Sequence, residues 1–454
     1  MKTAFLAVLF SVLFALTIAT VPLTMTPVSA NGAIERVISP ADRRTLTHDI
    51  ATGPDSSVNV IWVDNGPAGA APPGSAPRDH ARDQVSAGPS RGHGGKNDLY
   101  FARSIDGGVN FSAPLRINDI GNEVRGSANS RPRIAIGKTG TIHVWWPSYR
   151  YLSDDKPTVI DSRYTRSTDG GRTFEPARTL NSDTDRDTHN MDHMGVRAEH
   201  AFGSLAVGPD GRVSAFWIDS RDKAANSNVA AMYMRVSNDD GKTFEPDRRV
   251  IAEGICPCCQ INAIVSATGK IFVSWRHVFT NGSRTSVVAS STDGGQTWGA
   301  PVRVTARDWL IDACPLKPAS LATDNAGRLY VSWFAGEEKP AGVYFAVSMD
   351  GGTTFAAPVL MHREAQVSDH AQLAVDNRGT VVAMWDAKAG GQKRVFMRVS
   401  RDNGRTFGLV REFKTAAEAT WPTVAFDGKN RMRVTWLENN QLMFRGFSQM
   451  LARN

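Results

Sequence analysis

The side chains with the most distinctive chemistry are four cysteines. Cys256, Cys258 and Cys259 form a Cys-Pro-Cys-Cys string, and Cys314 follows 55 residues after the last of them. Thiolates bind soft metal ions, so these four side chains predict a copper site, or a zinc site if it is closed to solvent. Nearby histidines would complete such a ligand set.

Two further interpretations of the cysteines stay open. An exported chain with an even number of cysteines normally forms disulfides, and four cysteines allow three pairings. Cys256 and Cys314 each precede a proline, and a bond between them would leave Cys258 and Cys259 as an adjacent pair. Adjacent cysteines bridge only with a distorted peptide. A redox-active thiol pair is the third interpretation.

A cluster of histidines lies upstream of these cysteines. His189, His193 and His200 fall within twelve residues, beside methionines and acidic side chains. Imidazole and thioether groups suit copper, and imidazole also suits zinc. His193 and His200 are therefore predicted as metal ligands together with the cysteines.

A nine-residue pattern that occurs six times positions these groups. Each copy has an aspartate, a glycine two residues later and an aromatic residue five residues after the aspartate. The aspartate can close a turn onto its own backbone, and the glycine supplies a positive φ. The six aspartates are Asp106, Asp169, Asp239, Asp293, Asp350 and Asp402.

A second repeat consists of short alternating strands that each end in tryptophan. With the strands around them they predict a four-stranded antiparallel meander per repeat, which is the blade of an all-β propeller. The tryptophans favour seven blades, with six as the alternative, and 34–39 is expected to close the ring as an outer strand. These strands are Val58–Trp62, Thr141–Trp146, Val213–Trp217, Ile271–Trp275, Leu329–Trp333, Val381–Trp385 and Met432–Trp436.

A meander sorts its connections onto two faces. The six turns share one face with the loops that join first to second strands, whereas the loops after each tryptophan and the blade crossovers lie on the opposite face. All four cysteines and eight of the ten histidines fall on that opposite face. We therefore expect the functional site there, at the central mouth.

The six-fold pattern resembles the Asp-box, or bacterial neuraminidase repeat, of sialidases. The resemblance implies glycan binding or exo-sialidase-like hydrolysis, with three arginines holding the sugar carboxylate, an acidic proton donor and a tyrosine nucleophile. The string closest to the family's Arg-Ile-Pro signature begins at Arg131. Carried onto this chain, the resemblance implies catalytic roles for Arg131, Arg197, Arg276, Asp192 and Tyr149.

Bulk features limit the cellular setting and the partners. Residues 1–30 resemble a secretory signal peptide, which leaves 31–454 as one propeller domain with a flexible loop at 66–96. The formal net charge of +7 is scattered without a basic run, which excludes nucleic acid as a partner. We expect a secreted or periplasmic protein with no membrane span after signal cleavage. Its ligand would be a glycan or another anionic small molecule, or alternatively a transition metal bound without hydrolysis, and a protein partner is also compatible.

Overall fold

The computed structural model describes residues 33–67, 97–153, 156–183, 198–221, 230–311, 313, 315–363, 365 and 367–448. The predicted signal peptide and the loop from residue 68 to 96 lie outside the described residues, and so do Asp192, His193, Arg197 and Cys314. Every regular element within the described ranges is a β-strand. None of the described residues forms a helix with the length and apolar character needed to cross a membrane.

The strands in chain order are β1 (Ala33–Val37), β2 (Arg43–Thr52), β3 (Val58–Pro67), β4 (Asn97–Ser104), β5 (Leu115–Arg116), β6 (Arg133–Ile136), β7 (Ile142–Ser153), β8 (Lys156–Ser167), β9 (Arg178–Thr179), β10 (Ala198–Val207), β11 (Val213–Asp219), β12 (Ala230–Ser237), β13 (Arg248–Ile255), β14 (Asn262–Val265), β15 (Ile271–Val278), β16 (Arg284–Ser291), β17 (Val302–Arg303), β18 (Ser320–Thr323), β19 (Leu329–Ala335), β20 (Gly342–Ser348), β21 (Val359–Leu360), β22 (Ser368–Val375), β23 (Val381–Ala389), β24 (Gln392–Ser400), β25 (Arg411–Phe413), β26 (Ala419–Phe426), β27 (Met432–Glu438) and β28 (Gln441–Phe447).

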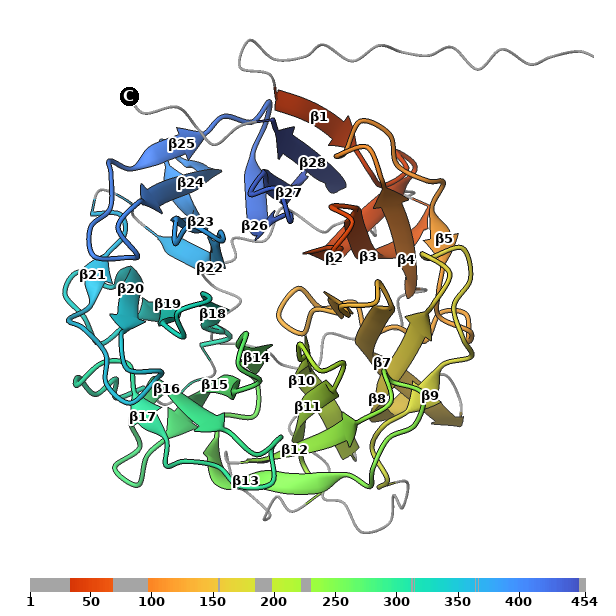
Figure 1. Ribbon diagram of the computed structural model, residues 1–454, viewed down its shortest axis with the longest axis horizontal. Helices are drawn as coiled ribbons and strands as arrows, with labels where there is room; N and C mark the ends of the chain where they lie inside the picture. The colour runs from red at the N-terminus through yellow and green to blue at the C-terminus, as the bar shows by residue number, and fades with distance from the viewer. Residues whose placement is uncertain are drawn as a thin grey trace, which may run out of the picture.

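Consecutive strands pair antiparallel in groups of four, which confirms the predicted all-β architecture of four-stranded blades. Six groups run from β2–β5 to β22–β25, and the last group is β26, β27 and β28 with β1 beside β28, from Ala33↔Phe447 to Val37↔Met443. The first strand of each group lies toward the centre of the ring and the short fourth strand lies at the rim (Figure 1). Four of these groups are separate four-stranded sheets, and pairing of β8 with β10 and of β13 with β15 joins the other three into one twelve-stranded sheet; β1 is the outer strand of the last group.

The six predicted turns owe their shape to the aspartate side chain. Asp169 Oδ1 accepts hydrogen bonds from Ser167 Oγ at 2.8 Å and from the Arg172 and Thr173 backbone N–H groups at 3.0 Å, while Oδ2 accepts one from Thr173 Oγ1 at 2.6 Å. The aromatic residue that ends the turn packs against the preceding blade, as Phe174 does edge-on against Phe101 with ring centroids 5.2 Å apart. Each such turn therefore also joins two blades.

The tryptophans of the second repeat are buried in the core, as expected from their fixed register. Three of them donate the indole N–H to a carboxylate two residues later, and these pairs are Trp62–Asp64 at 2.9 Å, Trp217–Asp219 at 2.8 Å and Trp436–Glu438 at 2.8 Å. This bond satisfies the polar atom of a buried aromatic ring. It also fixes an acidic side chain at the end of each second strand, on the crossover face.

Contacts between neighbouring blades confirm which connections share a face. Thr141, in the turn between β6 and β7, donates to Asp240 of the next Asp-box at 2.5 Å, and Lys270, in the turn between β14 and β15, donates to the Gly351 carbonyl at 2.7 Å. A hollow of about 270 Å³ on this face is lined by Lys138, Asp210 and Asp240, among others, and holds none of the predicted site residues. The crossovers and the loops after the tryptophans lie at the other end of the strands.

Candidate functional site

The innermost strands are distorted where they begin, at the crossover face. Their pairing with the second strand is interrupted at β10 between Ala201 and Ser204, at β22 between Asp369 and Gln372, and at β26 between Thr420 and Thr423. The bulged residues Phe202, His370 and Trp421 have φ of 50°, 51° and 54°. Bulky side chains rarely adopt this left-handed region, and such strain concentrates at functional sites. The bulges turn three large side chains to the same level of the mouth.

A buried ion pair stands beside the first of these bulges. Arg125 donates to Glu199 in a very short contact, and its guanidinium carbon lies 4.9 Å from the centroid of the Phe202 ring. Tyr149 is close to both members of the pair. Burial raises the pKa of Tyr149; the nearby positive charge of Arg125 lowers it and the carboxylate of Glu199 raises it further. Tyr149 and Glu199 are therefore neighbours at the crossover face.

Arg131 enters the same region from the crossover that carries Arg125. Gln260 accepts a hydrogen bond from the Arg131 backbone N–H at 3.2 Å and donates to the carbonyls of Arg131 and Gly203 at 2.9 Å each, so it ties two crossovers to the bulge of β10. The Arg131 side chain is 3% exposed, and its Nε and Nη1 have no hydrogen-bond partner in the described residues.

Among the described residues, no carboxylate forms an ion pair with Arg131. Burial lowers the pKa of Arg131 to about 10, with the neighbouring charge of Arg133 adding to the effect and that of Asp49 opposing it. Asp49, however, lies 3.9 Å from the Arg133 guanidinium. Burial also lowers the pKa of nearby His48 to about 3, so this histidine is neutral at pH 7. A buried cation with unused donors is suited to bind an anion.

Arg276, another predicted ligand of the carboxylate, is occupied differently. Its terminal nitrogens donate to the backbone carbonyls of Arg284 at 3.2 Å, Lys317 at 3.1 Å and Phe334 at 3.2 Å. Its guanidinium lies 5.0 Å from the centroid of the Trp309 ring. These contacts hold three strand ends together, so the structure connects Arg131 with the Tyr149 region but gives Arg276 a structural position beside the cysteines.

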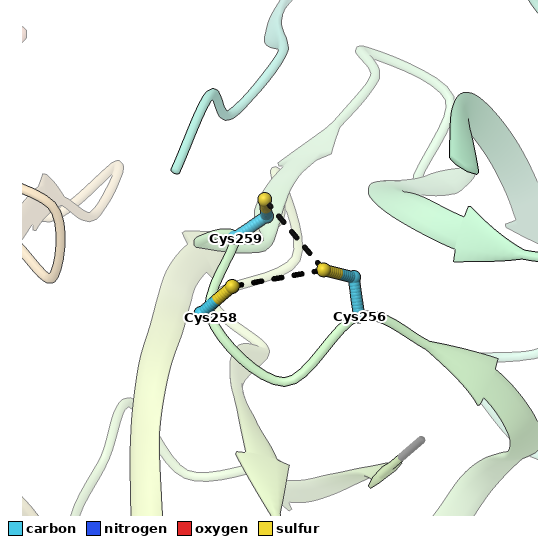
Figure 2. Close-up of side chains that lie close together, drawn as sticks. All are labelled: Cys256, Cys258 and Cys259. Atoms are coloured by element: carbon cyan, nitrogen blue, oxygen red, sulfur yellow. Dashed lines mark hydrogen bonds between the residues drawn. The ribbon is translucent and has the colours of Figure 1, made fainter. Parts of the chain in front are cut away.

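The three cysteines of the Cys-Pro-Cys-Cys string converge between β13 and β14 (Figure 2). Cys256 Sγ lies 3.7 Å from Cys258 Sγ and 3.9 Å from Cys259 Sγ, and all three side chains are buried. Cys258 is disulfide-bonded, whereas Cys256 and Cys259 are free thiols. The suggested Cys256–Cys314 bond is therefore wrong, because Cys256 points into the cluster beside Arg284, 3.7 Å from its Nη1.

The two free thiols have opposite acidities. The hydrogen bond from Cys256 lowers the pKa of Cys259 to about 6 against the effect of burial, helped by the charge of Arg276 and by backbone N–H groups of Lys317 and Leu316. The same hydrogen bond, together with burial, raises the pKa of Cys256.

His200 does not join the cysteines, contrary to the predicted ligand set. Its Nε2 lies 3.7 Å from carboxylate oxygens of both Asp183 and Asp219, and its Nδ1 lies 2.8 Å from the Ile160 carbonyl oxygen. Burial lowers the pKa of His200, but the charge of Asp219 and the bond to Asp183 outweigh it, and the net shift is upward. Asp219 already accepts from Trp217 and Arg221. His200 therefore lies in a network of charged side chains formed with Asp183, Asp219 and Arg221.

The sequence did not reveal a second polar cluster at the mouth. His370 stacks on Trp421 with ring centroids 3.3 Å apart, and its Nδ1 lies 2.5 Å from Asp386 Oδ2. The backbone N–H of Trp421 donates to the same carboxylate at 2.9 Å, and Lys317 pairs with the neighbouring Asp369. The available clues were the Trp-Asp string at 385–386 and a histidine in the crossover before β22.

Comparisons with known proteins agree with this architecture. The family described as BNR repeat-like domain matches residues 198–434. Among solved structures, a protein of unknown function from Dyadobacter fermentans has a TM-score of 0.50 and 16% identity, covering 81% of this chain and 98% of that chain. A Hadza microbial sialidase has a TM-score of 0.47 and 14% identity, covering 91% and 94%.

The intramolecular trans-sialidase from Ruminococcus gnavus has a TM-score of 0.47 and 12% identity, covering 91% of this chain and 96% of that chain. At such identities the likeness concerns the fold. No match was found among curated proteins.

Proposed function

This chain belongs to the BNR repeat-like domain family, and from that premise we propose that it binds a carboxylate-bearing sugar at the propeller mouth. The observation that carries the proposal is the buried guanidinium of Arg131, whose Nε and Nη1 have no hydrogen-bond partner in the described residues. A buried donor without a partner costs roughly 1–3 kcal/mol. A ligand that supplies the missing acceptors offsets this cost on binding.

A carboxylate fits this position better than a neutral group. A guanidinium donates charge-assisted hydrogen bonds to an anion, and the burial of Arg131 strengthens the attraction between opposite charges. The nearest acidic side chain, Asp49, is associated with Arg133. The unpaired charge of Arg131 is thus available to an external anion.

The surrounding side chains suit the rest of a sugar. Trp421, stacked on His370 at the start of β26, offers an aromatic surface, whereas Phe202 of β10 is buried under Arg125. Small-molecule sites typically combine such aromatic surfaces with a few fixed polar groups. Gln260 and Glu199 are polar groups held in place by their own bonds.

We propose that the activity is binding of this sugar. Hydrolysis of a glycoside is a separate activity, and it needs its own experiment. A glycosidase of this type would use Tyr149 as nucleophile with Glu199 as its base. Burial raises the pKa of Tyr149, and Glu199 is held by Arg125. Both features oppose formation of the phenolate that attack on a sugar requires.

Calorimetric titration of the full chain with sialic acid, glucuronic acid and neutral galactose tests the proposal. We expect binding of at least one acidic sugar and none of galactose. Arg131→Met should abolish that binding, while Arg116→Met, which changes an exposed arginine on β5, should leave it intact. Equal binding by Arg131→Met and the wild-type protein, or no binding of either acidic sugar, would overturn the proposal. Release of a fluorophore from a sialoside, lost in Tyr149→Phe, would add hydrolysis to it.

We further propose that this binding takes place outside the cytoplasm, because residues 1–30 have the composition of a secretory signal. Expression of the full chain followed by cell fractionation and N-terminal sequencing tests this point. Processed protein in the periplasm or the medium, beginning near Asn31, is the expected result. Unprocessed protein in the cytoplasm would contradict it.

A further inference from the structure

The cysteine cluster supports a second site that is independent of the sugar site. We propose that Cys256 and Cys259 form a two-thiolate site for Cu(I), and that Cys258 becomes a third ligand when its disulfide is reduced. The site lies between the end of β13 and the start of β14, on the crossover face of the propeller.

The spacing of the sulfur atoms suits a shared metal ion. Two thiolates about 2.3 Å from one ion, at tetrahedral to trigonal angles, lie about 3.8–4.0 Å apart. Cys256 Sγ and Cys259 Sγ are 3.9 Å apart, and Cys258 Sγ is 3.7 Å from Cys256 Sγ. The three sulfurs all lie within 4.8 Å of one another. The spacing of the three sulfurs therefore fits an ion bound by all of them, whereas Cys256 and Cys259 alone would have to move apart to bind Cu(I) in a linear arrangement.

The charges around the cluster favour a complex with negative charge. Arg284 Nη1 lies 3.7 Å from Cys256 Sγ, and the charge of Arg276 acts on Cys259. Both arginines are buried, and the Nε of each lacks a hydrogen-bond partner in the described residues. Glu337, the carboxylate whose charge reaches Arg276, is engaged by Thr285. Two buried guanidinium groups therefore stand next to the thiols, and a bis-thiolate Cu(I) complex with a net charge of −1 would balance one of them.

Backbone groups also stabilise a thiolate at this position. The N–H groups of Leu316 and Lys317 are directed at Cys259, and Leu316 has φ of 53°. A turn with a residue in this left-handed region can present successive N–H groups to an anion. The crossover before β18 thus completes the surroundings of Cys259 from the next blade.

The ligand set selects Cu(I) over harder ions. Within the described residues the group contains three sulfurs and no nitrogen or oxygen ligand, and thiolates prefer soft cations. Zinc in a closed protein site almost always takes four ligands, whereas the cluster offers two free thiols and one sulfur in a disulfide. Binding of Cu(I) replaces the protons of two thiols: one Cu⁺ and two thiols give one dithiolate complex and two H⁺.

Metal loading of the full chain, without any sugar, tests this proposal separately from the sugar site. Purified protein is titrated under argon with Cu(I) supplied as its acetonitrile complex, in competition with a chromogenic Cu(I) chelator. We expect one tightly bound Cu(I) per chain. X-ray absorption should show two sulfur neighbours in protein as isolated and three after treatment with a phosphine reductant.

Variants identify the ligands. Cys256→Ser and Cys259→Ser should each reduce the affinity for Cu(I) at least 100-fold, whereas Cys258→Ser should keep the two-sulfur site and lose the response to the reductant. Circular dichroism checks that each variant is folded. X-ray absorption of the wild-type protein identifies the atoms bound to copper without any variant. A first shell of nitrogen or oxygen atoms around copper would overturn the proposal. Stoichiometric zinc that an excess of Cu(I) does not displace would also overturn it, as would copper binding unchanged in Cys256→Ser and Cys259→Ser.

Discussion

Replacement of Arg131 by methionine should make the free protein more stable while it abolishes ligand binding. Burial lowers the pKa of Arg131 from its ordinary value to about 10, and one pKa unit corresponds to about 1.4 kcal/mol, so the buried charge costs roughly 3 kcal/mol of folding free energy. The buried donors without partners give a similar cost of roughly 1–3 kcal/mol each. Methionine keeps most of the apolar stem, and we expect the free energy of unfolding to rise by roughly 1–3 kcal/mol.

The pH dependence of this gain has a definite sign. Arg131 is a base whose folded-state pKa lies below its unfolded value. At pH 7 it is charged in both states, so the cost of burying the charge is fully present there. The cost falls as pH rises above about 10 toward the ordinary pKa of arginine, and the advantage of the methionine variant should shrink over the same interval.

Arg276→Met is the matched control. Arg276 is as deeply buried, yet its terminal nitrogens donate to three backbone carbonyls. Loss of three hydrogen bonds, each contributing roughly 0.5–1.5 kcal/mol, should lower the free energy of unfolding by roughly 2–4 kcal/mol. The two substitutions are chemically identical and should shift stability in opposite directions.

Urea unfolding followed by tryptophan fluorescence measures both effects, as shifts of the midpoint at constant slope. Calorimetry with the acidic sugar is run on the same samples. If Arg131→Met lowers the urea midpoint as Arg276→Met does, Arg131 stabilises the fold. The argument that its buried charge destabilises the free protein is then refuted.

Three further outcomes are expected. In Asp239 and Asp402, hydrogen bonds of the turn keep the folded-state pKa at about 2, below the ordinary value of 3.8. Their stabilisation is therefore present above pH 4 and is lost as pH falls toward 2, and urea midpoints that stay constant from pH 6 to pH 3 would contradict this. Glu199→Gln leaves Arg125 buried without a counter-charge and should cost roughly 3–5 kcal/mol, measured by urea unfolding; the added change Arg125→Met should restore most of it. Deletion of Ala33–Val37 exposes the edge of β28 and should produce concentration-dependent oligomers in size-exclusion chromatography, whereas a stable monomer would argue against β1 as an edge cover.

The architecture was largely predictable because its determinants are local and repeated. The aspartate of each turn bonds to residues within four positions, as Asp169 does to Ser167 and Thr173, so the pattern is visible in the sequence alone. The tryptophans at the ends of the second strands are equally regular, and their burial follows from size and register. The position of β1 beside β28 followed from counting strands in the last repeat.

For the candidate site, the sequence predicted only the face of the propeller on which it lies, not the contacts between its side chains. Arg131 and Arg276 look alike in the sequence, and their difference comes from the carbonyl groups that happen to surround each one. The position of His370 depends on a β-bulge in its inner strand, which re-aims side chains by one residue and leaves no mark in composition. Which residues of separate crossovers meet is a tertiary property, and spacing along the chain does not encode it.

The pairing of β1 with β28 also determines when the molecule can finish folding. Glu35 of β1 and Arg445 of β28 are ion-paired across 410 residues of chain. Among the described strands β1 is synthesised before β28, so its outer backbone groups stay bonded to water until β28 has been made. Each doubling of the loop length adds only a little to the entropic cost of bringing the two strands together. Contacts between residues so far apart in the sequence nevertheless slow folding. The ring can therefore close only after β28 has been made. The blades between β1 and β28 can form in the order of their synthesis, and the final step brings the two ends of the described chain together.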